Sequence, residues 1–489
     1  MLFGSLEFLF GFLPPVLIIY HVLRLNDKAV LAKSWLVAAS LVFYGWWKIS
    51  YVPLMLISIG ANYAISLLIE KKPRQSRIYL IIGLIGNLGL LGYYKYANFF
   101  TSTVSAIAGL DWNARHILLP LAISFFTFQQ IAYLVEVYKE KKAADSLLDY
   151  SLFVMFFPHL IAGPITHHKE MLPQFKNAGR GKLSPAFFST GAAVLILGLA
   201  KKVVVADTFA LVANPIFAAA EHGVHLSFSQ AWLGALAYTL QLYYDFSGYS
   251  DMAIGLGLLF GIRLPVNFAS PYKSTSIIEF WRRWHITLSR FLRQYLYIPF
   301  GGNRKGPARR YLNLFLTMLL GGLWHGAGWT FIIWGGLHGA YLIVNHGWRN
   351  AFGVLEGVIA RCLGWCVTFI AVVLAWVLFR AATFHGALAI LGAMVPWPQA
   401  AHAASAAPPS LAAWVGVIVA LIGSIALPNA LEMARYPVAI AGAEEAEGAP
   451  LRPLQWRLSW VFTGVFLGFI GALALAKLPD PGIFLYFNF

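Results

Sequence analysis

His325 lies where an imidazole has few obvious roles, inside the apolar stretch "LLGGLWHGAGWTFIIWGGLHGAY" (319–341). Glycines flank it on both sides, and small residues let a helix or a ligand approach the backbone closely. With little water to stabilise its charge, the ring is favoured in the neutral form, and a neutral imidazole is a general base. We therefore predict catalysis at His325, with packing as the alternative; His338, further along, is a weaker candidate.

A second histidine, His285, falls within "FWRRWHITLSRFLRQYLY" (280–297). If this stretch is a helix, with about 100° between successive residues, the aromatic and leucine side chains of the stretch share an arc of about 140° with His285. The arginines occupy the opposite side. This pattern predicts one interfacial amphipathic helix on the cytoplasmic surface, with His285 turned inward and its arginines on headgroups or in water. The alternative for His285 is a core histidine bonded to a carbonyl.

Two carboxylates, Asp245 and Asp251, interrupt the apolar segment "QLYYDFSGYSDMAIGLG" (241–257). An ionisable residue at membrane depth is costly and is by default a functional candidate. Each carboxylate has an equally good alternative, as a helix cap or as the partner of a nearby arginine. We treat both as supporting residues.

The chain ends in "PDPGIFLYFNF" (479–489), an aromatic tail with one phenolic hydroxyl. Proline and glycine end the last apolar run and permit a reversal. If the tail is extended, side chains alternate, so that Tyr486 and Asn488 face one way and Phe487 the other. We predict an aromatic plug whose Tyr486 hydroxyl faces the centre of the protein and accepts an acyl group. The alternative is a purely structural anchor.

The composition places these residues in a membrane protein. Hydrophobic residues make up 59% of the 489 positions and charged residues 11%, whereas a soluble domain is about a quarter charged. Apolar runs near the spanning length of about 20 residues predict an all-α polytopic protein with ten to twelve spans. The first run reads as a retained span and not as a signal peptide. Two cysteines are too few for a disulfide framework or a metal site.

The net charge of +16 fits membrane topology better than nucleic-acid binding, because lysines and arginines gather in loops that face the cytoplasm. Arg24, Lys28 and Lys33 follow the first span and place the N-terminus outside. Arg452 and Arg457 precede the last span and place the tail outside. We therefore expect both termini on the periplasmic side. A transporter would also explain polar residues in the membrane, but it predicts an internal repeat, and we detect none.

Four stretches together resemble the membrane-bound O-acyltransferase (MBOAT) family. They are "FFPHLIAGPI" (156–165), "YYDFSGYSDMAIGLGLLFGI" (243–262), "FWRRWHITLSRFLRQYLYIPFGGNR" (280–304) and "GGLWHGAGWTFIIWG" (321–335). Within the family they most resemble the membrane subunits of alginate O-acetyltransferases. The resemblance implies one domain over 1–489, built as a ring of about 10–12 transmembrane helices with interfacial helices and a central tunnel, and ending in a tail at 478–489.

The resemblance also implies roles for residues. His325 matches the family's catalytic histidine, and His285 matches a second functional histidine on the donor side. Polysaccharide-modifying members take acetyl from cytoplasmic acetyl-CoA and pass it across the inner membrane to a periplasmic or membrane-anchored partner transferase. The tail resembles an aromatic C-terminal motif whose tyrosine is proposed to carry the acyl group.

For the donor, the basic segment 271–310 holds nine Lys/Arg residues and one Glu, which suits phosphate or headgroups. We expect this face to bind acetyl-CoA, without a metal. The expected donor-binding residues are Trp281, Arg282, Arg283, Trp284, Arg304 and Trp324.

The polymer is left open by "AGPITHHKEMLPQF" (162–175), whose histidine pair departs from the alginate pattern. We expect alginate as the acetylated polymer. Acetylated cellulose and peptidoglycan are the alternatives. A lipid O-acyltransferase is less favoured, because it has no need of a hydroxyl-bearing tail.

Overall fold

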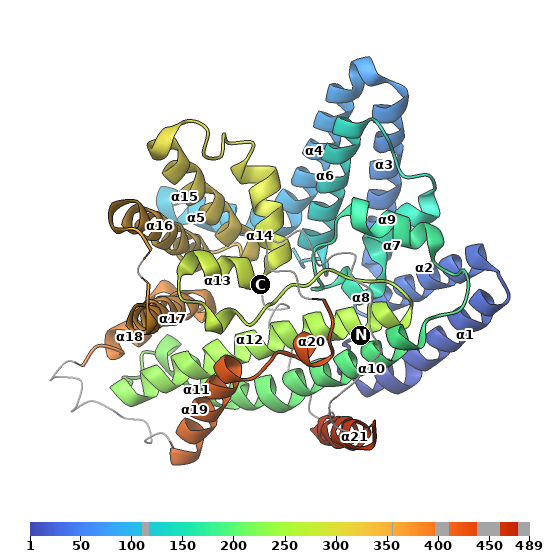
Figure 1. The fold of residues 1–489 in the computed structure, drawn as a ribbon. Coiled ribbons are helices and arrows are strands. Elements are labelled where there is room, and N and C mark those ends of the chain that lie inside the picture. The colour runs from blue at the N-terminus through green and yellow to red at the C-terminus, as the bar shows by residue number, and fades with distance from the viewer. Residues whose placement is uncertain (110–116, 355, 397–409, 438–459, 478–489) are drawn as a thin grey trace. The chain divides into compact units, whose positions relative to one another are not determined.

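The computed structural model describes residues 1–109, 117–354, 356–396, 410–437 and 460–477 (Figure 1). Every regular element in these ranges is a helix, which confirms the all-α class. Four described helical stretches are long and apolar enough to cross a membrane: Glu7–Leu25, Ile49–Lys71, Pro73–Ala108 and Val358–Arg380. Shorter apolar helices cover Ala29–Gly45, Phe384–Ala393, Leu411–Ala426 and Gly464–Lys477. The total of ten to twelve spans stays a prediction.

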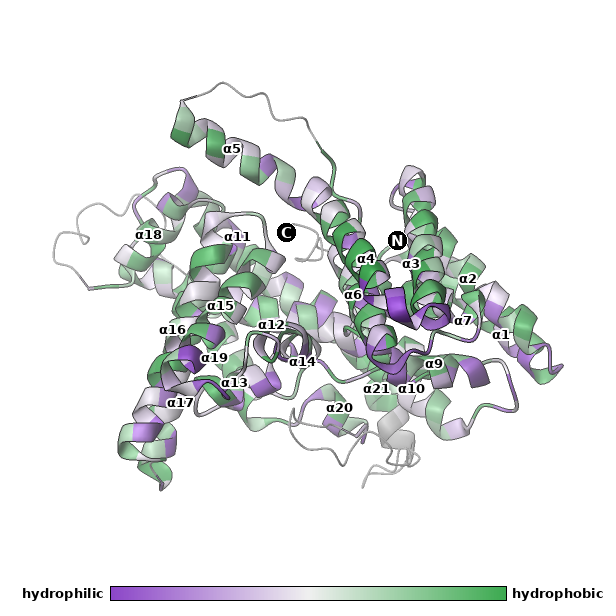
Figure 2. Cartoon of the chain, turned by 90° about the horizontal axis from the view of Figure 1, so that it is seen from above, coloured by the Kyte–Doolittle hydropathy of each residue, from purple (hydrophilic) through white to green (hydrophobic). Residues whose placement is uncertain are grey.

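The chain forms two compact units. The first contains Met1–Leu195 and Ser250–Pro265, and the second contains Ile196–Tyr249 together with the described parts of 266–489. The helices of the first unit are α1 (Leu13–Leu25), α2 (Ala29–Gly45), α3 (Val52–Lys71), α4 (Ser76–Leu91), α5 (Ala97–Ala108), α6 (Ile123–Glu140), α7 (Leu147–Met155), α8 (Phe157–Leu160), α9 (His168–Asn177) and most of α10 (Pro185–Ala200). Figure 2 shows apolar residues along much of α3 and α4.

Buried polar contacts join the helices of the first unit. Asn87 of α4 donates to Asn62 of α3 at 2.6 Å. The buried pair of Lys33 on α2 and Asp149 on α7 is 2.7 Å long. In an apolar environment, side chains of this kind are retained where a partner satisfies them, so the contacts fix which helices are neighbours.

The helices of the second unit are α11 (Asp207–Glu221), α12 (Phe228–Leu259, which ends in the first unit), α13 (Ile277–Arg283), α14 (Ile286–Leu292), α15 (Gly306–His325), α16 (Trp329–Phe352), α17 (Val358–Arg380), α18 (Phe384–Ala393), α19 (Leu411–Ala426), α20 (Ala430–Met433) and α21 (Trp460–Lys477). Irregular helical turns also occur, at Lys201–Ala206 before α11 and at Arg293–Tyr297 after α14. The 32 residues of α12 extend about 48 Å, more than the apolar thickness of a bilayer.

Glycines set the close packing of α15 against α16. The apolar residues near 312–345 form two helices joined by the short turn at 326–328. Gly322 of α15 lies against Gly335 of α16, where a side chain on either would meet backbone atoms of the other helix. The helices run antiparallel, because Gly335 contacts Met318 and Gly322 while Gly339 contacts Phe315. This hairpin carries both His325 and His338.

Candidate active site

His325 is the last residue of α15, so it ends a helix and does not lie in the interior of one. Gly326 follows it as the cap, and a side chain there would overlap the ring of Phe331. The chain then turns at once into α16. Gly326 thus serves a tight turn that holds the imidazole at the end of the hairpin, whereas Gly322, on the other side of His325, serves the packing against α16.

Aromatic rings surround the His325 imidazole, whose residue is 5% exposed. The ring centroid of Trp324 is 5.0 Å away, and those of Trp334 and Phe379 are each 5.2 Å away. These rings come from α15, α16 and α17, so three helices hold the imidazole. An apolar wall of this kind excludes water and strengthens any electrostatic interaction that the ring makes.

His285 does not lie in a continuous amphipathic helix, and that prediction was wrong. The stretch contains α13, a break at Trp284 and His285, then α14. His285 adopts φ 44° and ψ 53°, a left-handed conformation that costs an L-residue about 1–2 kcal/mol. The prediction that His285 points inward is confirmed, because the residue is fully buried. Periodicity identified the buried side correctly but gave no sign of the break.

The two histidines lie side by side within the second unit. The centroids of the His285 and His325 rings are 6.0 Å apart. Trp324 packs beside both imidazoles, and Phe246 of α12 stacks edge-on to His285 with centroids 4.9 Å apart. Burial lowers the pKa of the His285 imidazole to about 3, so its ring is neutral at physiological pH. Residues forty positions apart thus form one buried pair.

Asn267 is a polar partner of His285 that the sequence reasoning missed. Its Oδ1 lies 3.0 Å from His285 Nδ1 and 2.9 Å from the hydroxyl of Thr287. A signal for it was present, since Asn267 is a polar residue in the mainly apolar stretch shortly before the arginine-rich segment. An amide in such a position needs hydrogen-bonding partners when it is buried.

His338, the weaker candidate, is near the middle of α16. It is fully buried, and its Nδ1 accepts from Trp281 Nε1 at 3.3 Å. The ring centroid of Trp334 is 4.8 Å away and that of Trp376 is 6.1 Å away. His338 therefore belongs to an aromatic core that joins α13, α16 and α17.

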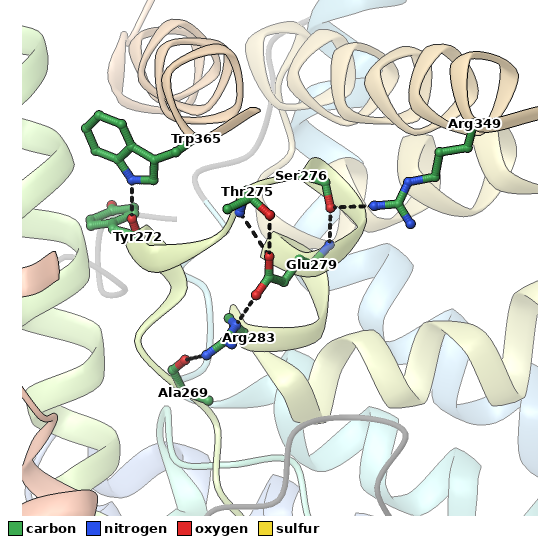
Figure 3. A network of polar contacts seen from close by, with 8 residues as sticks. All are labelled: Ala269, Tyr272, Thr275, Ser276, Glu279, Arg283, Arg349 and Trp365. Atoms are coloured by element: carbon green, nitrogen blue, oxygen red, sulfur yellow. Dashed lines mark hydrogen bonds and ion pairs between the residues drawn. The ribbon is translucent and has the colours of Figure 1, made fainter. Parts of the chain in front are cut away.

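Figure 3 shows the polar contacts that hold α13 in place. The Ser276 side chain caps α13 by accepting from Glu279 N, and Arg349 of α16 donates to the same hydroxyl at 3.0 Å. Trp365 of α17 donates to the Tyr272 carbonyl at 2.8 Å. These contacts tie the start of α13 to α16 and α17, and so fix the position of the residues that precede His285.

The expected donor-binding arginines differ in their environments. Arg283 donates to Glu279 Oε1 at 2.9 Å and to the Ala269 carbonyl at 3.0 Å, so its guanidinium already serves the fold (Figure 3). Arg282 and Arg304 are exposed. A structural guanidinium is a weaker choice for binding phosphate than an exposed one, so Arg282 and Arg304 are the better candidates. The three expected tryptophans, Trp281, Trp284 and Trp324, are buried.

Asp245 pairs with a lysine, whereas the sequence suggested an arginine or a helix cap as the alternative to a functional role. Lys202 Nζ lies 2.9 Å from Asp245 Oδ1 and 2.5 Å from Asp207 Oδ1. Gly248 permits the close packing, since a side chain there would meet the carbonyl oxygen of Gly198 at 2.8 Å. Asp251 is buried in the part of α12 that belongs to the first unit.

Two expected site residues, Tyr486 and Asn488, lie outside the described residues. Among the residues that the structure does describe, no group of three or more His, Cys, Asp or Glu side chains is arranged to hold a metal ion. The described site is therefore a buried pair of imidazoles enclosed by aromatic rings, with Asn267 bonded to Nδ1 of His285. Such a pair can accept and return protons in a setting that excludes water.

Comparisons with known proteins identify relatives that extend over most of the chain. The chain is 47% identical to the peptidoglycan O-acetyltransferase of Helicobacter pylori over 81% of its length and 80% of that protein. It is 45% identical to the "Probable alginate O-acetylase AlgI" of Pseudomonas putida, again over 81% and 80%. A teichoic acid D-alanyltransferase of Streptococcus thermophilus is 27% identical over 53% of this chain and 68% of its own.

A family model matches the part of the chain that contains the histidine pair. Residues 139–384 match the family described as "MBOAT, membrane-bound O-acyltransferase family", and this range includes both histidines. This match, together with the relatives that align over 81% of the chain, confirms the resemblance seen in the four sequence motifs. The chain therefore belongs to the membrane-bound O-acyltransferase family.

Proposed function

We propose that this membrane O-acyltransferase takes acetyl from acetyl-CoA at the cytoplasmic face of the bacterial inner membrane and passes it outward, where a partner transferase acetylates a polysaccharide. The observation that carries the proposal is the buried pair of His285 and His325, with ring centroids 6.0 Å apart. The relatives support polymer modification, since their names specify acetylation of alginate or peptidoglycan and D-alanylation of teichoic acid.

In the proposed reaction, His325 acts as the general base. It removes the proton from an acceptor hydroxyl, and the oxygen attacks the carbonyl carbon of the thioester. The carbon–sulfur bond breaks, and the proton returns from the imidazole to the CoA thiolate. The products are an acetyl ester and CoA, and no metal or oxidant is required. His285 lies on the donor side, where its neutral ring accepts a hydrogen bond.

The acceptor hydroxyl in this proposal is Tyr486. A phenol of pKa about 10 is a poor nucleophile at neutral pH, so it needs a base such as His325 beside it. The ester formed at Tyr486 is then attacked from outside by the partner protein, which is the periplasmic or membrane-anchored transferase. Arg282 and Arg304, which are exposed, supply positive charge for the phosphates of CoA.

The test replaces His325 with alanine and uses His222→Ala as the matched control. His222 is an exposed histidine of the same unit, just after α11. Loss of a general base should lower acetyl transfer by about 10²–10⁴-fold while the protein remains folded and inserted. Transfer is measured as base-released acetate in the polymer, normalised to membrane-inserted protein. A His325→Ala variant that acetylates as fast as the His222→Ala control contradicts the proposal.

The acetylated polymer needs its own experiment, because the chain is nearly equally identical to its alginate and peptidoglycan relatives, at 45% and 47%. We propose alginate first and peptidoglycan as the second candidate. Base-released acetate is compared between a deletion strain and its parent in the purified exopolysaccharide and in the purified peptidoglycan. The purified fraction that loses acetate in the deletion strain identifies the acceptor polymer. If both fractions retain their acetate, neither polymer is the acceptor.

A further inference from the structure

One buried amide oxygen, Oδ1 of Asn267, meets three polar groups around the turn that carries His285. The His285 ring atom Nδ1 lies 3.0 Å from it. The Thr287 hydroxyl donates to it at 2.9 Å and the Thr287 main-chain N–H at 3.3 Å. Asn267 itself is fully buried.

The three contacts determine the chemical role of each atom. A main-chain N–H only donates, so the Asn267 atom that faces Thr287 is the oxygen and not the amide nitrogen. An amide oxygen only accepts, so the His285 atom that faces it, Nδ1, carries a hydrogen. In a neutral imidazole with hydrogen on Nδ1, the lone pair is on Nε2. The contact thus selects one of the two tautomers.

The main chain of Asn267 holds the same turn. Its carbonyl accepts from Ile286 N at 3.0 Å, and Ala269 N donates to the Arg283 carbonyl at 2.9 Å. These bonds lie on both sides of the left-handed residue His285. They offset a backbone conformation that costs about 1–2 kcal/mol, and they orient the ring by fixing the residues before and after it.

We propose that Asn267 is a positioning residue that fixes the tautomer and orientation of His285, so that Nε2 presents a lone pair at the acyl-transfer site. This inference rests on the proposed function of His285. His325 of α15 is a titratable group that packs against His285. From α12 the neighbour is Phe246, and from the segment before α13 it is Phe268.

The first test is Asn267→Ala, read by ¹⁵N NMR of histidine-labelled full-length protein in nanodiscs. The signals of His285 are identified by their loss in His285→Gln. In the parent protein, Nε2 of His285 should show the ¹⁵N chemical shift of a ring nitrogen that carries no hydrogen. Without the acceptor, hydrogen should move to Nε2, and kcat should fall by about 10²–10⁴-fold with KM for acetyl-CoA little changed.

Asn267→Asp is the second test, and it keeps the acceptor oxygen while adding a negative charge. A carboxylate beside Nδ1–H raises the pKa of His285, so the charged ring forms at higher pH. In the parent, burial lowers that pKa to about 3, so His285 contributes no change in rate between about pH 5 and 8. The Asp variant should therefore regain activity at the alkaline end and lose it as the pH falls.

Asn313→Ala is the matched control. Asn313 is another fully buried asparagine of the second unit, and it donates to the Gly302 carbonyl at 3.0 Å. Its loss should lower stability but leave the His285 tautomer and the pH profile as in the parent. An unchanged tautomer in Asn267→Ala, or a pH profile in Asn267→Asp equal to that of the parent, overturns the proposal.

The experiment also separates this inference from the proposed function. If His285→Gln is inactive while Asn267→Ala keeps the parent tautomer and rate, His285 is functional and the role of Asn267 is refuted. If the tautomer changes in Asn267→Ala but both this variant and His285→Gln transfer acetyl at the parent rate, the proposed role of His285 fails, and the positioning role fails with it.

Discussion

A methyl group at Gly335 should force α15 and α16 apart. A Cβ built on Gly335 would overlap the carbonyl oxygen of Met318 and lie 3.1 Å from Gly322 Cα. Carbon atoms in contact are about 3.5–4.0 Å apart, so the helices must separate by about 0.4–0.9 Å. Both blocking atoms belong to backbone and cannot rotate away. Overpacking of this kind costs about 1–3 kcal/mol in the free energy of unfolding.

The separation should also slow the reaction. His325 ends α15, and its ring packs against that of Trp334, the neighbour of Gly335 on α16, with centroids 5.2 Å apart. A change in the distance between the helices therefore moves the imidazole relative to its wall. A misplacement of about 1 Å can lower a reaction rate about 10²-fold. We therefore expect Gly335→Ala to lower the acetyl transfer rate by about ten- to a hundredfold.

Gly336→Ala is the matched control, one position along the same helix. Its nearest atoms are side-chain carbons of Leu319 and Phe315 at 3.6 Å, an ordinary contact. Both variants gain the same methyl group and the same helix propensity, about 1 kcal/mol over glycine. The difference between them therefore reports the contact between α15 and α16.

The assay has two parts, both on protein in nanodiscs. The midpoint of thermal unfolding measures stability, and the acetyl transfer rate per folded protein measures catalysis. Gly335→Ala should unfold at a lower temperature than Gly336→Ala and transfer acetyl more slowly. Equal midpoints and equal rates for the two variants would refute the reasoning.

Two further predictions address the ion cluster and the tail. Lys202→Met should lower the free energy of unfolding by about 3–5 kcal/mol, because the buried Asp245 loses its ammonium partner; Lys201→Met is the control, and equal thermal midpoints would contradict this. Tyr486→Phe keeps the aromatic ring and removes the oxygen, so it should abolish both polymer acetylation and covalent labelling by radioactive acetyl-CoA. A parental rate in this variant would make Tyr486 an anchor.

The sequence by itself determined the class of the protein, the buried side of the arginine-rich segment and the histidines worth testing. These properties are local. A run of apolar residues dictates burial in lipid or in a core wherever the chain folds. Side-chain direction follows from the helical period, so His285 was assigned correctly to the buried side although the helix is interrupted at that residue. The four motifs identified the family for the same reason, since each is a continuous stretch.

Only the tertiary structure decided how those residues meet. The break at His285 is held by Asn267, eighteen positions earlier, and periodicity within a helix cannot reveal a bond of that kind. The approach of His325 to His285 depends on the hairpin of α15 and α16, whose spacing is set by Gly322 against Gly335. The partner of Asp245 was likewise decided by packing, which brought Lys202 to it from another helical segment. In each case, residues distant in the chain meet because the packing of the helices brings them together, which no local pattern in the sequence specifies.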